Sequence, residues 1–138
     1  MSYETTPHEE LTDSIVHAAR TSLGDTLRSV VYFTPATFEV LYTRQGLYQS
    51  LDVAREAKSQ LVEFERTGFA EVPVRTAIAQ TGARSDIGEY QFTVRFHEDG
   101  FVVRVIRGDA GVLFTTDSMD VNAFEDAVSA VSKLLTEA

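Results

Sequence analysis

The sequence predicts an α+β domain in which a five-stranded antiparallel sheet carries helices on both faces. Three observations support this fold class. Residues 89–98 alternate between apolar and polar side chains and run into Asp99-Gly100, a dipeptide typical of tight hairpin turns. Residues 27–33 are apolar at both odd and even positions, so both faces of that strand need cover. Three other segments repeat apolar residues at helical spacing.

The first of these segments predicts a helix over residues 7–23. Thr6 is the expected N-cap, because its hydroxyl can accept a hydrogen bond from the first turn. Pro7 fits the first helical position, where no backbone N–H is needed. Gly24 follows the last periodic residue and is expected to end the helix.

Two strands and a second helix are expected next. Residues 27–33 and 38–44 flank a short turn, which predicts a hairpin. From Ser50 the apolar period becomes helical, and Gly68 is expected to end this helix. Its predicted apolar stripe consists of Leu51, Ala54, Ala57, Leu61 and Phe64.

Residues 69–88 have no clear period. They contain Pro73, Gly82 and Gly88, which favour an irregular loop. One helical turn at residues 75–80 and an irregular edge segment are the alternatives. A loop of this length in a small domain is either functional or conceals an element.

The remaining chain predicts a three-stranded meander and a last helix. If Asp99 and Gly100 are the two loop residues, Phe96 lies opposite Val103 and Arg95 lies opposite Arg104. A second turn follows at residues 108–111, and residues 117–120 are expected to cap the final helix. Residues 1–138 thus form a single predicted domain, with residues 1–6 frayed.

The charge balance is strongly acidic and narrows the possible partners. Aspartate and glutamate total 21 against 12 lysines and arginines, giving a net charge of -9. Only Lys58 and Lys133 are lysines, and the acidic residues occur in almost every segment. Such a surface disfavours nonspecific binding to nucleic-acid phosphates. It is typical of a protein from a salt-rich cytoplasm, and an ordinary acidic protein is the alternative.

This composition predicts that folding depends on salt. Like charges on the surface repel one another, and added salt screens that repulsion. Thermal unfolding should therefore show a higher midpoint in molar KCl than in dilute buffer. A midpoint that does not rise with salt would remove the main support for adaptation to a salt-rich cytoplasm.

No segment predicts insertion into a membrane, since the longest apolar runs are only a few residues. The N-terminal residues are acidic and lack an apolar stretch, so they do not form a secretory signal. Cysteine is absent, which excludes disulfides and thiolate chemistry. The expected location is the cytoplasm.

The predicted element order resembles that of roadblock/dynein light chain domains. It resembles more loosely the profilin-like group that includes longin, PAS and GAF domains. The strings GEYQFTVRFHEDG at residues 88–100 and GDAGVLFTTD at residues 108–117 are similar to those of small acidic proteins of halophilic archaea with no assigned function. The roadblock resemblance implies a small dimeric scaffold for GTPases and signalling complexes. The resemblance to the archaeal proteins implies no catalytic residues.

No catalytic or cofactor-binding signature occurs in the sequence. The motifs GxSxG, GxGxxG and GxxxxGK[ST] are missing. His97-Glu98-Asp99 is better interpreted as a solvated turn than as a weak metal site, because consecutive strand side chains point to opposite faces. We therefore predict a protein that is not an enzyme, holds no cofactor or metal, and acts as a protein-interaction or regulatory scaffold module.

One predicted face of the meander is a candidate site for an acidic partner or an anion. It would consist of Arg95, Arg104, His97, Val102 and Ile106. The alternative is that the second helix covers this face and that Glu56 and Glu63 neutralise the two arginines.

A homodimer is also expected, built through the second helix and an edge of the sheet. Residues 89–98 would form an exposed edge strand with little charge to prevent pairing. The candidate contact residues are Val53, Val62, Thr93 and Arg95. A monomer in which residues 69–88 cover that edge is the alternative.

The competing function is a small-molecule sensor. Aromatic residues gather in the first hairpin and its exit, including Tyr32, Tyr42 and Tyr48. They are expected in the core, but PAS-like domains bind ligands in a pocket between the sheet and flanking helices. A pocket there would support the sensor function.

Overall fold

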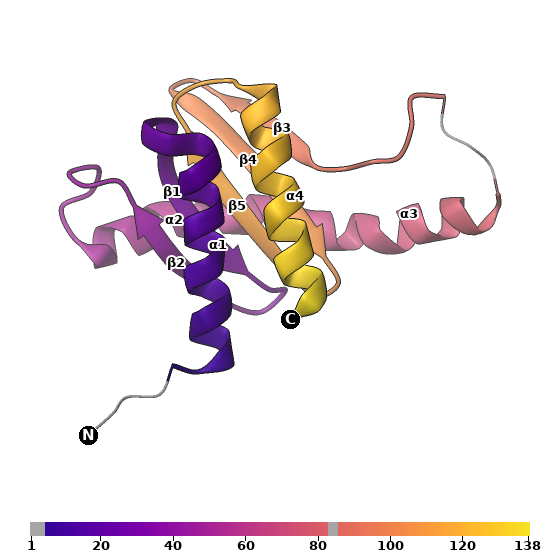
Figure 1. Ribbon diagram of the computed structural model, residues 1–138, viewed down its shortest axis with the longest axis horizontal. Coiled ribbons are helices and arrows are strands. Elements are labelled where there is room, and N and C mark those ends of the chain that lie inside the picture. Colours follow the sequence, from indigo (N-terminus) through magenta and orange to yellow (C-terminus); the bar gives the residue numbers. More distant parts are fainter. Residues whose placement is uncertain (1–4, 83–85) are drawn as a thin grey trace.

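One five-stranded sheet organises the chain, and all of its neighbouring strands are antiparallel (Figure 1). The computed structural model describes residues 5–82 and 86–138. The spatial order of the strands is β2-β1-β5-β4-β3, which leaves β2 and β3 at the two edges. The strands are β1 Leu27–Phe33, β2 Phe38–Thr43, β3 Thr93–His97, β4 Gly100–Arg107 and β5 Ala110–Thr116.

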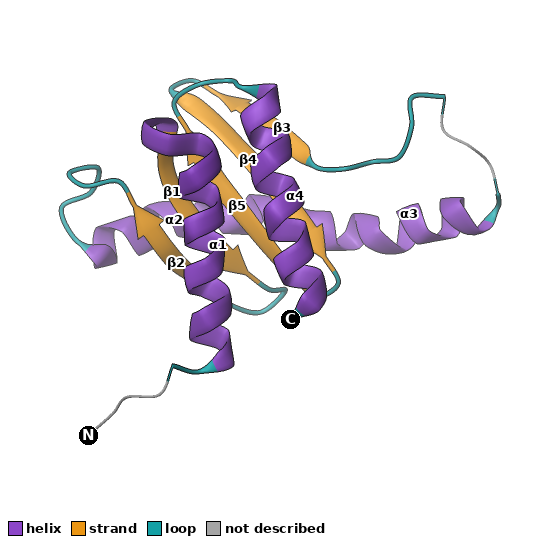
Figure 2. Ribbon diagram, in the orientation of Figure 1, coloured by secondary structure: helices purple, strands orange, loops and turns teal. Residues whose placement is uncertain are grey.

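Helices cover both faces of this sheet, as Figure 2 shows. α1 (Pro7–Leu23) and α4 (Val121–Glu137) pack side by side on one face. α2 (Leu51–Arg66) lies on the other face and continues through a 3₁₀ turn at Thr67–Ala70 into α3 (Glu71–Gln80). The predicted fold class and arrangement of helices are confirmed.

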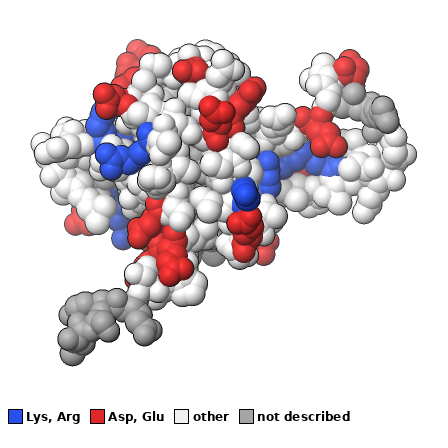
Figure 3. Space-filling model, in the orientation of Figure 1, with Lys and Arg blue, Asp and Glu red and all other residues white. Residues whose placement is uncertain are grey.

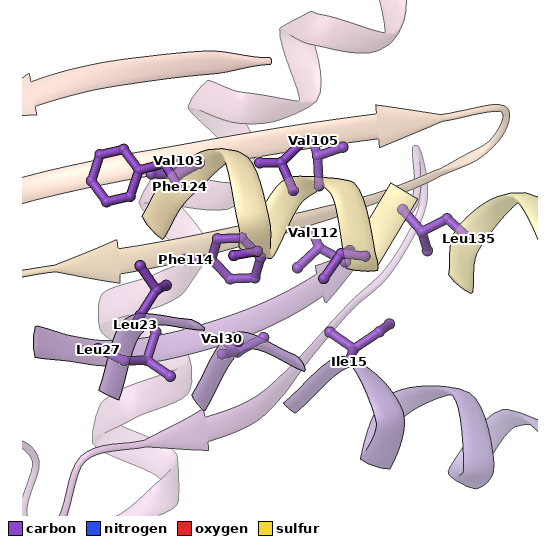
Figure 4. Close-up of a cluster of buried hydrophobic side chains, with 14 residues drawn as sticks. Ile15, Leu23, Leu27, Val30, Val103, Val105, Val112, Phe114, Phe124 and Leu135 are labelled. Carbon is purple, nitrogen blue, oxygen red and sulfur yellow. The ribbon is translucent and has the colours of Figure 1, made fainter. Parts of the chain in front are cut away.

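The larger hydrophobic core lies between the sheet and the α1–α4 pair (Figure 4). Fourteen buried apolar residues form it, and β1, β4 and β5 contribute alternate side chains from the sheet. They are Ile15, Ala19, Leu23, Leu27, Val30, Val103, Val105, Val112, Phe114, Phe124, Ala127, Val128, Val131 and Leu135.

A smaller core lies on the α2 face of the sheet. It consists of Val31, Phe33, Val62, Val102, Ile106 and Leu113. β1 therefore buries side chains on both faces, which explains its apolar residues at both parities. Phe33 lies over Gly111 of β5, where any Cβ would come within 2.5 Å of its ring.

The helix ends follow the predicted capping chemistry. The Thr6 side chain accepts a hydrogen bond from the Glu9 backbone N–H at 3.1 Å, so Thr6 is not frayed. Asp120 likewise caps α4 by accepting from the Ala123 N–H at 3.0 Å. Gly24 ends α1 with a φ of 57°, a conformation that glycine adopts at little cost. The frayed segment predicted at residues 1–6 otherwise lies largely outside the described residues.

The turn of the β3–β4 hairpin lies one residue earlier in the sequence than predicted, which changes the strand register. Glu98 and Asp99 form the loop, and His97 pairs with Gly100. Gly100 has no positive φ; instead, a Cβ there would lie 2.6 Å from the Thr116 carbonyl oxygen. The glycine is thus needed for close strand packing rather than for the turn.

This register also shortens and exposes the edge strand. β3 covers Thr93–His97 rather than residues 89–98. Phe96 is 74% exposed and Tyr90 is 43% exposed, so the predicted buried row is only partly buried. The cause is that β3 has a neighbouring strand on one side only.

The irregular loop predicted for residues 69–88 is wrong over α3. Residues Glu71–Gln80 form a helix, and Pro73 is accommodated because it lies in the first turn. α3 continues α2 past the sheet and has no buried residue, so it gives no apolar stripe in the sequence (Figure 1). Part of the predicted loop, residues 83–85, lies outside the described residues.

Candidate functional site

α2 presents a mixed polar and apolar face to the sheet. Its buried residues are Ala54, Lys58, Val62 and Glu65. The predicted apolar stripe is wrong at Leu51, Ala57 and Phe64. Leu51 and Phe64 are 63% and 56% exposed, and Ala57 is exposed as well. The face of α2 that packs on the sheet is therefore the one that carries Glu65, which contacts basic side chains of the sheet. Leu51 and Phe64 lie on the solvent-exposed face of the helix.

Glu65 is the centre of a buried ion network. Arg95 of β3 donates from Nε to both carboxylate oxygens of Glu65, at 2.9 and 3.1 Å. Arg104 of β4 donates from Nη1 to Glu65 Oε1 at 3.3 Å. Glu65 is fully buried and Arg104 is 1% exposed. Two strands are thereby tied to α2 by charge-assisted hydrogen bonds.

Arg104 extends the network to α3. Its Nη2 donates to Glu71 Oε1 and to Thr93 Oγ1, each at 3.0 Å. Burial opposes the positive charge, but hydrogen bonding to Tyr90 and the charges of Glu71 and Glu65 outweigh it and raise the pKa of Arg104. The guanidinium is therefore charged in the folded protein.

The structure corrects the predicted partner for these arginines. One of the two interpretations predicted that α2 covers this face of the sheet, and it does. The carboxylate that neutralises the arginines, however, is Glu65 rather than Glu56 or Glu63. Glu63 is exposed and pairs with Arg66 of its own helix, and Glu56 has an exposed side chain. Arg95 lies opposite Val102 rather than opposite Arg104.

The candidate patch of five residues is not a surface. Arg104, Val102 and Ile106 are buried beneath α2. Arg95 is partly exposed, with its guanidinium 4.4 Å from the ring centroid of Phe64. His97 lies at the exposed end of β3 beside the hairpin turn. The prediction that these five residues form an exposed apolar and basic patch is wrong.

Of the four candidate dimer contacts, one is buried and three are at least partly exposed to solvent. Val62 is fully buried in the smaller core and is unavailable to a partner. Val53 is 42% exposed, and Thr93 and Arg95 lie on the edge strand β3. The structure exposes further apolar residues that were not predicted as contacts: Phe64 on α2, Val74 and Ile78 on α3, and Phe96 on β3. We call these four residues, together with the outer edge of β3, the edge surface.

Lys58 was not predicted as a site residue, and the structure places it in a pocket of about 300 Å³. The pocket lies between α2 and the end of the sheet that carries the β3–β4 turn. Desolvation by burial lowers the pKa of Lys58, and a hydrogen bond with Tyr48 partly offsets that effect. The signal in the sequence was a lysine at a helix position three residues before Leu61, within the apolar stripe.

Charge and residue types limit what else this chain can bind. Acidic side chains are spread over the face formed by α1 and α4 rather than gathered in one patch (Figure 3). Within residues 5–82 and 86–138, no group of three metal-binding side chains comes together. In the same residues, no helix is long and apolar enough to cross a membrane.

Comparison with known proteins identifies a family and a fold. The family model described as "Domain of unknown function (DUF7522)" matches residues 13–136. The solved structure of the gliding protein MglB from Thermus thermophilus is similar to this chain with a TM-score of 0.58 and 12% sequence identity. The match covers 98% of this chain and 96% of that chain. No curated protein matches the sequence. The predicted roadblock-like fold is confirmed.

Proposed function

This chain belongs to the DUF7522 family, and we propose that it is a non-enzymatic protein-interaction module that acts as a homodimer. The observation that carries the proposal is the edge surface. Arg95 of the edge strand β3 donates to Glu65 of α2, and Thr93 of β3 accepts from Arg104, which also donates to Glu71 of α3. These two helices carry the exposed residues Phe64, Val74 and Ile78. An unpaired strand edge with apolar neighbours favours association with another sheet.

A second copy is the occupant that best fits this surface. Two antiparallel β3 strands related by a two-fold axis would pair edge to edge and extend the sheet. α3 continues past the sheet (Figure 1), and its exposed Val74 and Ile78 are the residues that we propose contact the partner copy. A stable dimer of this kind should bury about 1,200 Å² or more in total.

The proposal predicts that charge on α3 prevents dimerisation without unfolding the domain. The double variant Val74→Glu and Ile78→Glu should be a monomer, because both side chains are more than half exposed and α3 has no buried residue. Light scattering over a range of concentrations in high salt measures the mass. High salt is required because each copy carries a net charge of -9.

A matched control separates the interface from a general effect of charge. Val121 at the start of α4 is 56% exposed and lies on the opposite face of the sheet. Val121→Glu should leave the dimer intact. A 15.3 kDa wild-type species that does not change with concentration would contradict the proposal.

The resemblance to roadblock domains makes a small GTPase the partner class to test first. A dimer would present two copies of every remaining surface, which suits a scaffold. Size-exclusion chromatography with a purified small GTPase from the same organism should show co-elution in one nucleotide state and not in the other. Failure in both states would remove this partner class and leave the dimer proposal standing.

The sensor function has one observation in its favour. The large core beneath α1 and α4 is filled by side chains, but the α2 face contains the pocket lined by Lys58. For the sensor function we propose that a small molecule binds in the Lys58 pocket, whether or not the protein dimerises.

A further inference from the structure

The pocket beneath α2 combines cationic, aromatic and acidic groups. Lys58 lines one wall from α2, and Arg28 of β1 and Tyr48 stand near it. The β3–β4 turn contributes Glu98 and Asp99. A volume of about 300 Å³ is at the lower limit for sites that bind small molecules.

Lys58 is the feature of this pocket that the fold does not explain. Its side chain is almost fully buried, since only 2% of the residue is exposed. Among residues 5–82 and 86–138, no carboxylate lies within 4.0 Å of its ammonium group. Its ammonium group lies over the ring of Tyr48, with Nζ 5.3 Å from the ring centroid.

The contrast with Arg104 shows how unusual this is in the same chain. Arg104 is equally buried, but it has two carboxylate partners, Glu65 and Glu71. The chain contains 21 acidic residues and only two lysines. A buried ammonium without a counter-ion is unfavourable, and an apolar side chain of the same length would pack there at no electrostatic cost.

We propose that this pocket binds a small anionic molecule whose phosphate or carboxylate group lies against Lys58 and Arg28. Arg28 already donates one hydrogen bond from Nη1 to Asp117 at 3.1 Å and has further N–H donors. The anion supplies a negative charge in direct contact with Lys58, where none of the described carboxylates lies within 4.0 Å.

The acidic side of the pocket determines which chemical groups the other end of the ligand can carry. Glu98 and Asp99 repel a molecule that is anionic throughout and accept hydrogen bonds from hydroxyl or amino groups. The ligand class is therefore a small molecule with an anionic group at one end and hydrogen-bond donors at the other. Hydroxylated monophosphates and amino acids both have this character.

Thermal unfolding of the full chain with three probes tests the proposal. The probes are inorganic phosphate, glycerol 3-phosphate and L-serine, each titrated at constant ionic strength set with KCl. At least one probe should raise the midpoint of the wild-type protein saturably by several degrees, because a ligand bound only to the folded state stabilises it. The same probe should shift the backbone amide resonances of Asp99 and Gly100 in NMR spectra.

Two substitutions show whether Lys58 is responsible. Lys58→Met should raise the midpoint without ligand, because it removes a buried charge, and should abolish the response to the probe. Lys133 is the other lysine, is exposed on α4, and serves as the matched control. Lys133→Met should respond as the wild type does, which also accounts for any general stabilisation by phosphate. Lys58→Gln provides a second variant if Lys58→Met does not fold.

Two results would overturn the proposal. One is an equal response of the wild type and the Lys58 variants to every probe. The other is the lack of a saturable response of the wild type to all three. Neither result bears on dimerisation, because the pocket does not include Phe64, Val74 or Ile78.

Discussion

Replacing Glu65 with alanine should lower the free energy of unfolding by about 3–5 kcal/mol, the cost of breaking a buried ion pair. Glu65 is fully buried and accepts hydrogen bonds from both Arg95 and Arg104. Without it, Arg104 remains buried with Glu71 as its only carboxylate partner among the described residues. Urea denaturation at constant high salt measures the change.

Glu63 is the control for this substitution. It lies two residues away on the same helix, but its side chain is 69% exposed and it pairs with Arg66. Glu63→Ala should cost no more than about 1 kcal/mol, as exposed ion pairs do. A double variant, Glu65→Met with Arg104→Met, should be less destabilised than the sum of its single changes. Equal effects at Glu63 and Glu65 would contradict the network.

Gly68→Ala should destabilise the protein by about 2–3 kcal/mol, in the range found for overpacked interiors. A Cβ at this position would lie 2.6 Å from Arg104 Cζ and Nη1 and 2.7 Å from Ile106 Cδ1. Alanine is intrinsically better than glycine in a helical turn by about 0.5–1 kcal/mol. The steric cost exceeds this gain in helix propensity, because Arg104 cannot move away without breaking its hydrogen bonds to Glu65 and Thr93.

The Gly68 prediction has its own controls, also measured by urea denaturation. Thr67→Ala in the same 3₁₀ turn removes an exposed side chain and should change stability by no more than about 0.5 kcal/mol. In an Arg104→Met background the cost of Gly68→Ala should shrink, because a methionine side chain can bend away. A Gly68→Ala protein as stable as the wild type would show that the 3₁₀ turn at Thr67–Ala70 does not approach Arg104 so closely.

The sequence predicted the elements whose signals are local. The capping residues Thr6 and Asp120 act through bonds within one helical turn, and both predictions are confirmed. The two-sided apolar pattern of residues 27–33 correctly indicated a strand that is covered on both faces. The order of elements then sufficed to predict the fold class, because few arrangements bury both faces of such a sheet.

The incorrect predictions have two causes: contacts between segments that are distant in the sequence, and a helix that buries no residue. Gly100 looks like a turn residue, but its role depends on the carbonyl of Thr116 on the neighbouring strand. Glu65 looks like one more surface acid, and only its approach to Arg95 and Arg104 distinguishes it from Glu63. α3 was missed because a helix with no buried residue shows no apolar stripe.

The unequal construction of the two faces has a consequence for how the domain opens. The α1–α4 face is held by a continuous apolar core, whereas α2 and α3 are held by six buried apolar residues and an ion network. When α2 and α3 detach, the charges of that network return to water, and comparatively little apolar area is exposed. We therefore expect the α2–α3 segment to open at a lower free energy than the α1–α4 face, with amide protons that exchange before those of β1, β5 and α4. A partner bound to the outer face of this segment holds it closed and slows exchange across the whole of it.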